Sequence, residues 1–206
     1  MRIITISREF GSGGRELGKR LSDLMGFDYY DGEIITAIAQ NNGLDREYVE
    51  KVLSNHGWQN FPVTFRSTFG RLSYLQASKV DLLLEQKRVI QGIAALGNDC
   101  VIVGRNADVL LQQYQPFHIF VCARMEAKVK RCMERAGKEE NLTKKELIRK
   151  MRQIDKGRAQ TRELLTASPW GRRDAYHLIV NTSQWRIKDL APPVADFAAR
   201  WFGESL

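Results

Sequence analysis

Residues 2–17 read RIITISREFGSGGREL, and this stretch decides the fold class. Residues 2–7 are rich in isoleucine and end in polar residues, which is typical of a short buried strand. Residues 10–14 form a glycine-rich turn, after which leucines recur at i, i+4 and i+7 from Leu17. The stretch therefore predicts a strand, a glycine loop and a helix in direct succession.

A glycine loop between a strand and a helix is a candidate phosphate site. Its backbone N–H groups can point at an anion, the helix dipole adds to them, and glycine lets the main chain approach closely. The predicted site for the donor nucleotide and its phosphates contains Gly11, Ser12, Gly13, Gly14, Arg15 and Glu16. The alternative is an ordinary glycine-rich turn, and glycine content alone does not separate the two.

The loop departs from the P-loop pattern G-x-x-x-x-G-K-[ST]. With Gly13 on the second glycine, Arg8 stands on the first, Gly14 on the lysine and Arg15 on the hydroxyl residue. The lysine that bridges the terminal phosphates and the hydroxyl that holds Mg²⁺ are thus both missing. Arg15 or Arg8 could replace the charge and Ser12 the hydroxyl, and Arg15 is counted among the predicted catalytic residues.

Outward from this stretch, short apolar runs alternate with helical segments. The other predicted strands cover 27–31, 100–103, 117–122 and 177–180. The other predicted helices cover 33–54 in two pieces, 78–96, 124–135, 143–165 and 189–201. This alternation predicts an α/β fold with a doubly wound, mainly parallel five-stranded sheet. Ligands of such sheets bind at the carboxyl ends of the strands.

The net charge of +8 comes from one part of the 206-residue chain. Residues 124–173 hold 16 Lys and Arg against 7 Asp and Glu, and the remainder is nearly neutral. This distribution favours a dedicated polyanion site over a uniformly basic nucleic-acid surface. No apolar run approaches the roughly 20 residues of a membrane span. Three cysteines without metal-ligand spacing and the lack of a secretory signal predict a cytoplasmic location.

Six motifs occur in the order seen in cytidylate kinase-like proteins. They are ISREFGSGGRELGKRL (6–21), YYDGEII (29–35), CVIVGRNAD (100–108), FVCARMEAKVKR (120–131), IDKGRAQTRE (154–163) and SPWGRRDAYHLIVNTS (168–183). The chain resembles the cytidylate kinase-like family of the P-loop nucleoside monophosphate kinases, in the branch with a lysine-free GSGGRE loop. The resemblance implies one P-loop kinase-type domain over residues 1–206, with a helical lid over 137–165.

The resemblance also implies an acceptor site. Arg105 is expected to bind the acceptor phosphate, for which a guanidinium fork is well suited, although a structural salt bridge is the alternative. Asp31 is expected to contact the acceptor or a metal, with a helix N-cap as an equally open alternative.

Further arginines follow on the helix predicted over 124–135 and in the predicted lid. The resemblance places Arg131 and Arg135 near the donor nucleotide. Arg158 and Arg162 lie four residues apart on one helix face, and the resemblance brings both to the transferring phosphoryl group as catalytic residues. Arg131 and Arg135 belong to a stripe with Arg124 and Lys128 on one helix face, for which a solvated charged surface is the alternative.

The predicted function is transfer of the ATP γ-phosphoryl group to a nucleoside monophosphate, CMP-like, or to a similar small acceptor. Mg²⁺ is expected as a cofactor held mostly by phosphates and water, without a protein metal site. The missing lysine leaves a non-catalytic nucleotide sensor open, and the basic lid leaves a nucleic-acid-binding protein as the weakest alternative. The aromatic residues of 55–75 would either cover the acceptor or form a homodimer contact.

Overall fold

The computed structural model describes residues 1–32, 34–35, 79–135 and 143–203. The strands are β1 (Ile3–Arg8), β2 (Asp28–Asp31), β3 (Cys100–Val103), β4 (Phe117–Cys122) and β5 (Leu178–Asn181). They form one sheet in the order β2-β3-β1-β4-β5, and every neighbouring pair is parallel. The predicted five-stranded, doubly wound α/β sheet is confirmed.

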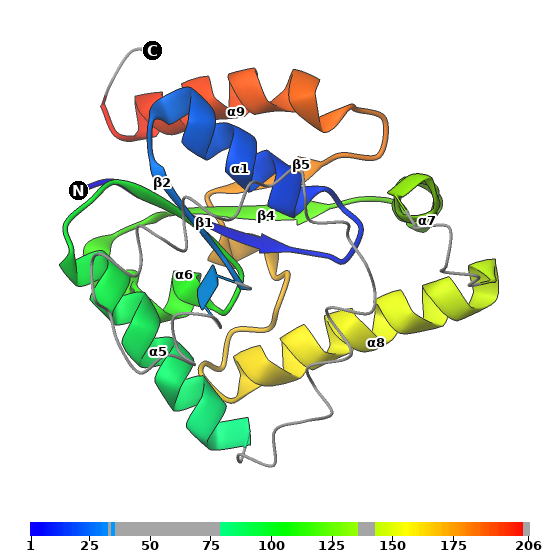
Figure 1. Ribbon diagram of the computed structural model, residues 1–206, viewed down its shortest axis with the longest axis horizontal. Coiled ribbons are helices and arrows are strands. Elements are labelled where there is room, and N and C mark those ends of the chain that lie inside the picture. The colour runs from blue at the N-terminus through cyan, green and yellow to red at the C-terminus, as the bar shows by residue number, and fades with distance from the viewer. Residues whose placement is uncertain (33, 36–78, 136–142, 204–206) are drawn as a thin grey trace.

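Helices cover both faces of this sheet (Figure 1). They are α1 (Gly14–Met25), α5 (Lys79–Ala95), α6 (Ala107–Leu110), α7 (Met125–Arg135), α8 (Lys144–Glu163) and α9 (Ile187–Trp201), with 3-10 turns at Gln112–Tyr114 and Arg173–Ala175. Figure 1 shows α1 and α9 together on one side and α5 and α8 on the other. Because the strands are buried on both faces, they read as continuous apolar runs in the sequence.

The core has one layer on each side of the sheet. Alternate residues of β1 point to opposite layers: Ile4 and Ile6 pack with α1 and α9, whereas Ile3 packs with α5. A smaller third cluster joins Phe10, from the glycine loop, to apolar residues of α7 and α8 such as Val129 and Met151. The loop is therefore packed into the fold, and α8 is attached to it.

Most predicted boundaries agree with the structure to within two residues. The capping box that opens α8 is present, because the Glu146 amide donates to Thr143 Oγ1 over 3.3 Å and the Glu146 carboxylate accepts from the Thr143 amide over 2.9 Å. Helix α9 begins at Ile187, two residues before the predicted start at 189, so Pro192 and Pro193 lie in its second turn.

Three predictions lie partly or wholly outside the described residues. They concern the helices predicted over 33–54, the aromatic segment 55–75 with its dimer or acceptor contact, and the beginning of the lid at 137–142. The rest of the predicted lid is helix α8, and its action as a lid stays a prediction. Within the described ranges, no helix combines the length and apolar character needed to cross a membrane.

Candidate functional site

The glycine loop joins β1 to α1 at the carboxyl edge of the sheet. Gly11 and Gly13 have φ values of 76° and 85°, in the left-handed region that glycine adopts at little cost. A Cβ at Gly13 would also lie 2.4 Å from Cδ1 of Ile187. Within the described ranges, no residue accepts a hydrogen bond from the amide N–H groups of Gly11, Gly13 or Gly14. The first turn of α1 thus has donors available for an anion.

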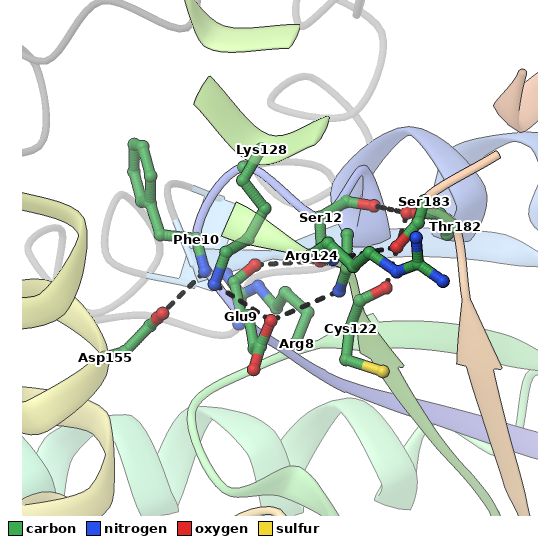
Figure 2. A network of polar contacts seen from close by, with 12 residues as sticks. Arg8, Glu9, Phe10, Ser12, Cys122, Arg124, Lys128, Asp155, Thr182 and Ser183 are labelled. Atoms are coloured by element: carbon green, nitrogen blue, oxygen red, sulfur yellow. Dashed lines mark hydrogen bonds and ion pairs between the residues drawn. The ribbon is translucent and has the colours of Figure 1, made fainter. Parts of the chain in front are cut away.

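Hydrogen bonds from distant segments fix the loop in place. The Ser12 hydroxyl is fully buried and donates to the Glu9 carbonyl over 2.8 Å. Thr182, just after β5, donates its hydroxyl to the Ser12 carbonyl over 2.6 Å (Figure 2). Because the Ser12 hydroxyl is already committed inside the protein, it is poorly placed to replace the missing metal-binding hydroxyl.

The donor-side arginines of α7 lie against the loop. Arg131 donates to the Gly11 carbonyl over 2.7 Å and to the Thr182 carbonyl over 3.2 Å, so one guanidinium connects the loop to the end of β5. Arg135 pairs with the carboxylate of Glu16 at the start of α1. The structure therefore brings Arg131, Arg135 and Glu16 together with the glycine loop, as the predicted donor site requires.

Helix α8 reaches the same loop through Asp155 and Arg158. The Asp155 carboxylate accepts from the Phe10 amide over 2.8 Å and from Arg158 Nη1 over 2.9 Å. Arg158 Nη1 also donates to the Arg8 carbonyl over 2.9 Å. Next to it, the Glu9 carboxylate accepts from Lys128 Nζ over 3.0 Å (Figure 2).

Sequence reasoning did not identify Glu9, Asp155 or Thr182 as residues that hold this loop. Their partners lie far away along the chain: 145 residues separate Phe10 from Asp155 and 170 separate Ser12 from Thr182. No local pattern predicts such pairs.

On the acceptor side, Asp31 at the end of β2 is almost completely buried. Its Oδ2 lies 2.7 Å from Nε of Arg15, and its Oδ1 accepts from the Ile34 amide over 3.1 Å. Asp31 thus caps the turn that follows it and also orients Arg15. The contact to the Ile34 amide is the capping contact that the sequence left open, and direct contact of Asp31 with the acceptor or a metal stays a prediction.

Arg105 follows β3 and extends to the same edge, where its Nη2 donates to the Gly32 carbonyl over 3.2 Å. Three consecutive residues here, Gly104, Arg105 and Asn106, have φ values of 85°, 56° and 53°. Left-handed conformations of residues other than glycine cost about 1–3 kcal/mol each and tend to occur at functional sites. The sharp turn at the end of β3 therefore indicates that the position of Arg105 matters.

Four guanidinium groups, Arg8, Arg15, Arg105 and Arg158, form what we call the arginine cluster. Burial and the neighbouring Arg158 charge lower the pKa of Arg8 to about 9. Burial also lowers the pKa of Arg158, although Asp155 opposes this shift and Arg105 adds to it. Arg8 and Arg158 remain charged at neutral pH, so the cluster concentrates positive charge that Asp31 and Asp155 offset only in part, and an anion that binds there would be stabilised.

Arg162 lies apart from this cluster. Its guanidinium pairs with the Asp108 carboxylate on α6 and donates through Nε to the Ser168 carbonyl over 2.9 Å. Both side chains are over 95% buried, and they border a polar pocket that His118 also lines. This placement favours a structural role for Arg162, because its charge is directed at Asp108, and the catalytic role that the sequence suggested stays a prediction.

His118 makes the stability of this region sensitive to pH. Burial lowers its pKa to about 4, and its Nδ1 lies 2.7 Å from Thr5 Oγ1. Between that pKa and the ordinary value near 6.5, the unfolded chain binds a proton that the folded chain does not, so stability falls as the pH drops through this range. We expect His118→Gln to lose less stability than the wild type between pH 7 and pH 5. Urea unfolding at both pH values measures this, and equal losses would contradict the assignment.

The described residues offer little for a metal ion. Among them, no three His, Cys, Asp or Glu side chains gather in a group that could hold one. The carboxylate of Asp31 is engaged by Arg15 and the Ile34 amide. Mg²⁺ would therefore fit this site as an ion carried on phosphate oxygens and water, with few protein ligands.

Comparisons with known structures agree with this fold. A structure of an uncharacterised protein from Eubacterium ventriosum ATCC 27560 matches with a TM-score of 0.70 at 22% identity, covering 96% of this chain and 98% of the other. Shikimate kinase from Bacteroides thetaiotaomicron matches with 0.53 at 12% identity, covering 95% and 97%. Shikimate kinase from Acinetobacter baumannii, in complex with shikimate, matches with 0.51 at 13% identity, covering 96% and 92%. These similarities establish the P-loop kinase fold.

A comparison with curated protein sequences found no match. The family model described as Cytidylate kinase-like family matches residues 3–184, which include the glycine loop, the arginine cluster and Thr182. Family and fold together point to a nucleotide-dependent kinase. The chain belongs to the cytidylate kinase-like family.

Proposed function

We propose that this protein transfers the γ-phosphoryl group of ATP to a nucleoside monophosphate, CMP-like, or to a similar small phosphorylated acceptor. One observation carries the proposal. A loop with available amide donors and a cluster of four arginines lie at the same carboxyl edge of the sheet, although their residues come from β1, α1, the β3–α6 turn and α8. Both features suit the phosphate groups of two nucleotides held end to end.

The donor phosphates bind the amides of Gly11, Gly13 and Gly14. The positive end of α1 adds to these donors, and the hydrogen bonds from Arg131 and Thr182 hold the loop in the binding conformation beforehand. A Mg²⁺ ion bound together with the donor would supply neutralisation of phosphate charge. This donor site needs no side-chain lysine to position the phosphates, although it needs a positive charge near the γ-phosphate.

The acceptor phosphate binds at Arg105 and Arg15. Asp31 holds Arg15 through a 2.7 Å contact, and the Gly32 carbonyl holds Arg105 over 3.2 Å. Two oriented guanidinium groups can each bind a phosphate through paired hydrogen bonds. A monophosphate suits this arrangement better than a neutral hydroxyl acceptor, because a phosphate dianion accepts charge-assisted hydrogen bonds from both guanidinium groups.

Phosphoryl transfer then requires positioning and charge stabilisation. An oxygen of the acceptor phosphate attacks the γ-phosphorus, the bond from the γ-phosphorus to the bridging β-oxygen breaks, and ADP leaves. Arg158 stabilises the charge on the moving group. Its guanidinium is held by Asp155 and the Arg8 carbonyl before substrate binds, so little reorganisation is needed.

A thermal-shift screen against nucleoside mono-, di- and triphosphates, with and without Mg²⁺, combined with a coupled assay for ADP release, tests this function. We expect the melting temperature to rise with ATP plus Mg²⁺ and with at least one monophosphate, since ligands that bind only the folded state stabilise it. ADP release should require both substrates. Binding without turnover across the acceptor panel would indicate a nucleotide sensor, and no binding at all would contradict the proposal.

A further inference from the structure

We infer that Arg8 takes the place of the missing P-loop lysine, and that positions 8 and 14 form a reciprocal pair in which only one residue can carry a side chain. This inference rests on the proposed function, because it assigns a role within the same phosphate site. Three observations carry it: the position of the Arg8 side chain, the space around Gly14 and Gly104, and the lack of a direct partner for the Arg8 guanidinium among the described residues.

The stem of Arg8 occupies the space that a side chain at position 14 would need. A Cβ built on Gly14 would lie 2.6 Å from Cβ of Arg8 and 3.0 Å from its Cγ. The Cβ of Arg8 cannot move aside, since β1 is paired with β4 at Arg8 and Val121. Gly14 is the position that corresponds to the lysine of the P-loop pattern, and Arg8 corresponds to the first glycine. Glycine at position 8 would remove the two nearest of these contacts and leave Cβ of Val121 at 3.2 Å, so a side chain at position 14 needs the side chain at position 8 to be absent.

The guanidinium of Arg8 extends from there toward the acceptor side. A Cβ at Gly104 would lie 1.6 Å from Nη1 of Arg8, so the absence of a side chain at the end of β3 provides the room for this group. Arg158 is close enough to lower its pKa. The positive charge of Arg8 thus lies between the glycine loop and the acceptor arginines, where the lysine of a P-loop bridges the terminal phosphates.

The guanidinium of Arg8 also lacks a direct partner in the described part of the chain. None of those residues forms an ion pair or hydrogen bond with it, although Arg131, Arg135 and Arg158 each have one, and Asp31 acts on it only from a distance, by raising its pKa. A partly buried cation without a direct partner loses hydration with little compensation. A bound triphosphate would supply the missing anion.

The test compares Arg8→Met, Arg8→Gly, Gly14→Lys and the exchange variant Arg8→Gly/Gly14→Lys, with Arg8→Lys as the conservative variant. Kd is measured for ATP with Mg²⁺ and for inorganic tripolyphosphate, turnover is measured by ADP release, and the melting temperature is measured without ligand. Methionine keeps the length of the side chain without its charge. The exchange variant recreates the G-x-x-x-x-G-K spacing at residues 8–14.

We expect Arg8→Met and Arg8→Gly to weaken binding of both probes about 10- to 100-fold, the size expected for a lost charged contact. Arg8→Met should raise the ligand-free melting temperature by about 2–4 °C, because an unpaired cation is removed. Arg8→Lys should retain part of the binding. Gly14→Lys alone should impair binding or folding, and the exchange variant should recover at least ten-fold over Arg8→Gly.

Unchanged binding and turnover in Arg8→Met and Arg8→Gly would overturn the inference and leave the proposed kinase function intact. An exchange variant no better than Arg8→Gly would overturn the reciprocal pairing. If the wild-type protein itself bound neither ATP nor tripolyphosphate, both the proposed function and this inference would be contradicted. A lower ligand-free melting temperature in Arg8→Met would indicate a structural role and would also count against it.

Discussion

Arg158→Ala is expected to reduce kcat on the order of 100- to 1000-fold while changing the Kd for ATP less than about three-fold. The guanidinium is held in place by Asp155 and the Arg8 carbonyl, and it lies within the arginine cluster where charge moves during transfer. An interaction made mainly in the transition state affects turnover more than ground-state binding. Steady-state ADP release and calorimetric ATP titration measure the two quantities separately.

Arg152→Ala is the matched control, because Arg152 is an exposed arginine on the same helix and should leave both quantities unchanged. Arg158→Lys should restore only part of the activity, since an ammonium does not reproduce the guanidinium fork. Equal turnover of Arg158→Ala and wild type, with a preserved melting temperature, would remove Arg158 from the mechanism.

Substitution of Arg162 by alanine is expected to have a large effect on the free energy of unfolding. Its ion pair with Asp108 is buried, and removing one partner of such a pair typically costs about 3–5 kcal/mol because the other charge stays buried and unpaired. One oxygen of Asp108, Oδ1, already lacks a hydrogen-bond partner among the described residues, so the carboxylate depends on Arg162 for its stabilisation. Arg162→Ala should therefore lower the free energy of unfolding in urea by that amount.

The double variant Asp108→Leu/Arg162→Met provides the control. It removes both charges and keeps most of the volume, so it should recover much of the stability that Arg162→Ala loses. At a temperature where each variant is folded, kcat should stay within a few-fold of wild type. A stable Arg162→Ala protein with strongly reduced kcat would contradict the structural assignment and support the catalytic role suggested by the sequence.

The fold was largely predictable because its determinants are local. The apolar runs at 100–103 and 117–122 are buried on both faces, and the capping box at Thr143 begins α8 through contacts within four residues. The glycine loop was also recognisable, since its main-chain conformation at Gly11 and Gly13 depends on glycine itself. Each of these signals lies within one segment of the chain.

The site was predictable only in part, because side-chain direction depends on tertiary contacts. Arg158 and Arg162 share a helix face, yet Arg158 is directed to the Arg8 carbonyl and Arg162 to Asp108 on α6. The spacing of the two arginines on α8 does not predict which partner each of them contacts. The relation between Arg8 and Gly14 also requires the structure, because it depends on a 2.6 Å approach between a strand residue and a helix residue that the sequence does not specify.

The most direct test of the phosphate site is a crystal structure with Mg²⁺ and a non-hydrolysable ATP analogue. We predict β- and γ-phosphates on the amides of Gly11, Gly13 and Gly14, with the γ-phosphate within hydrogen-bond distance of the Arg8 guanidinium. A triphosphate bound elsewhere, with the glycine loop empty and Arg8 without an anion, would contradict this site.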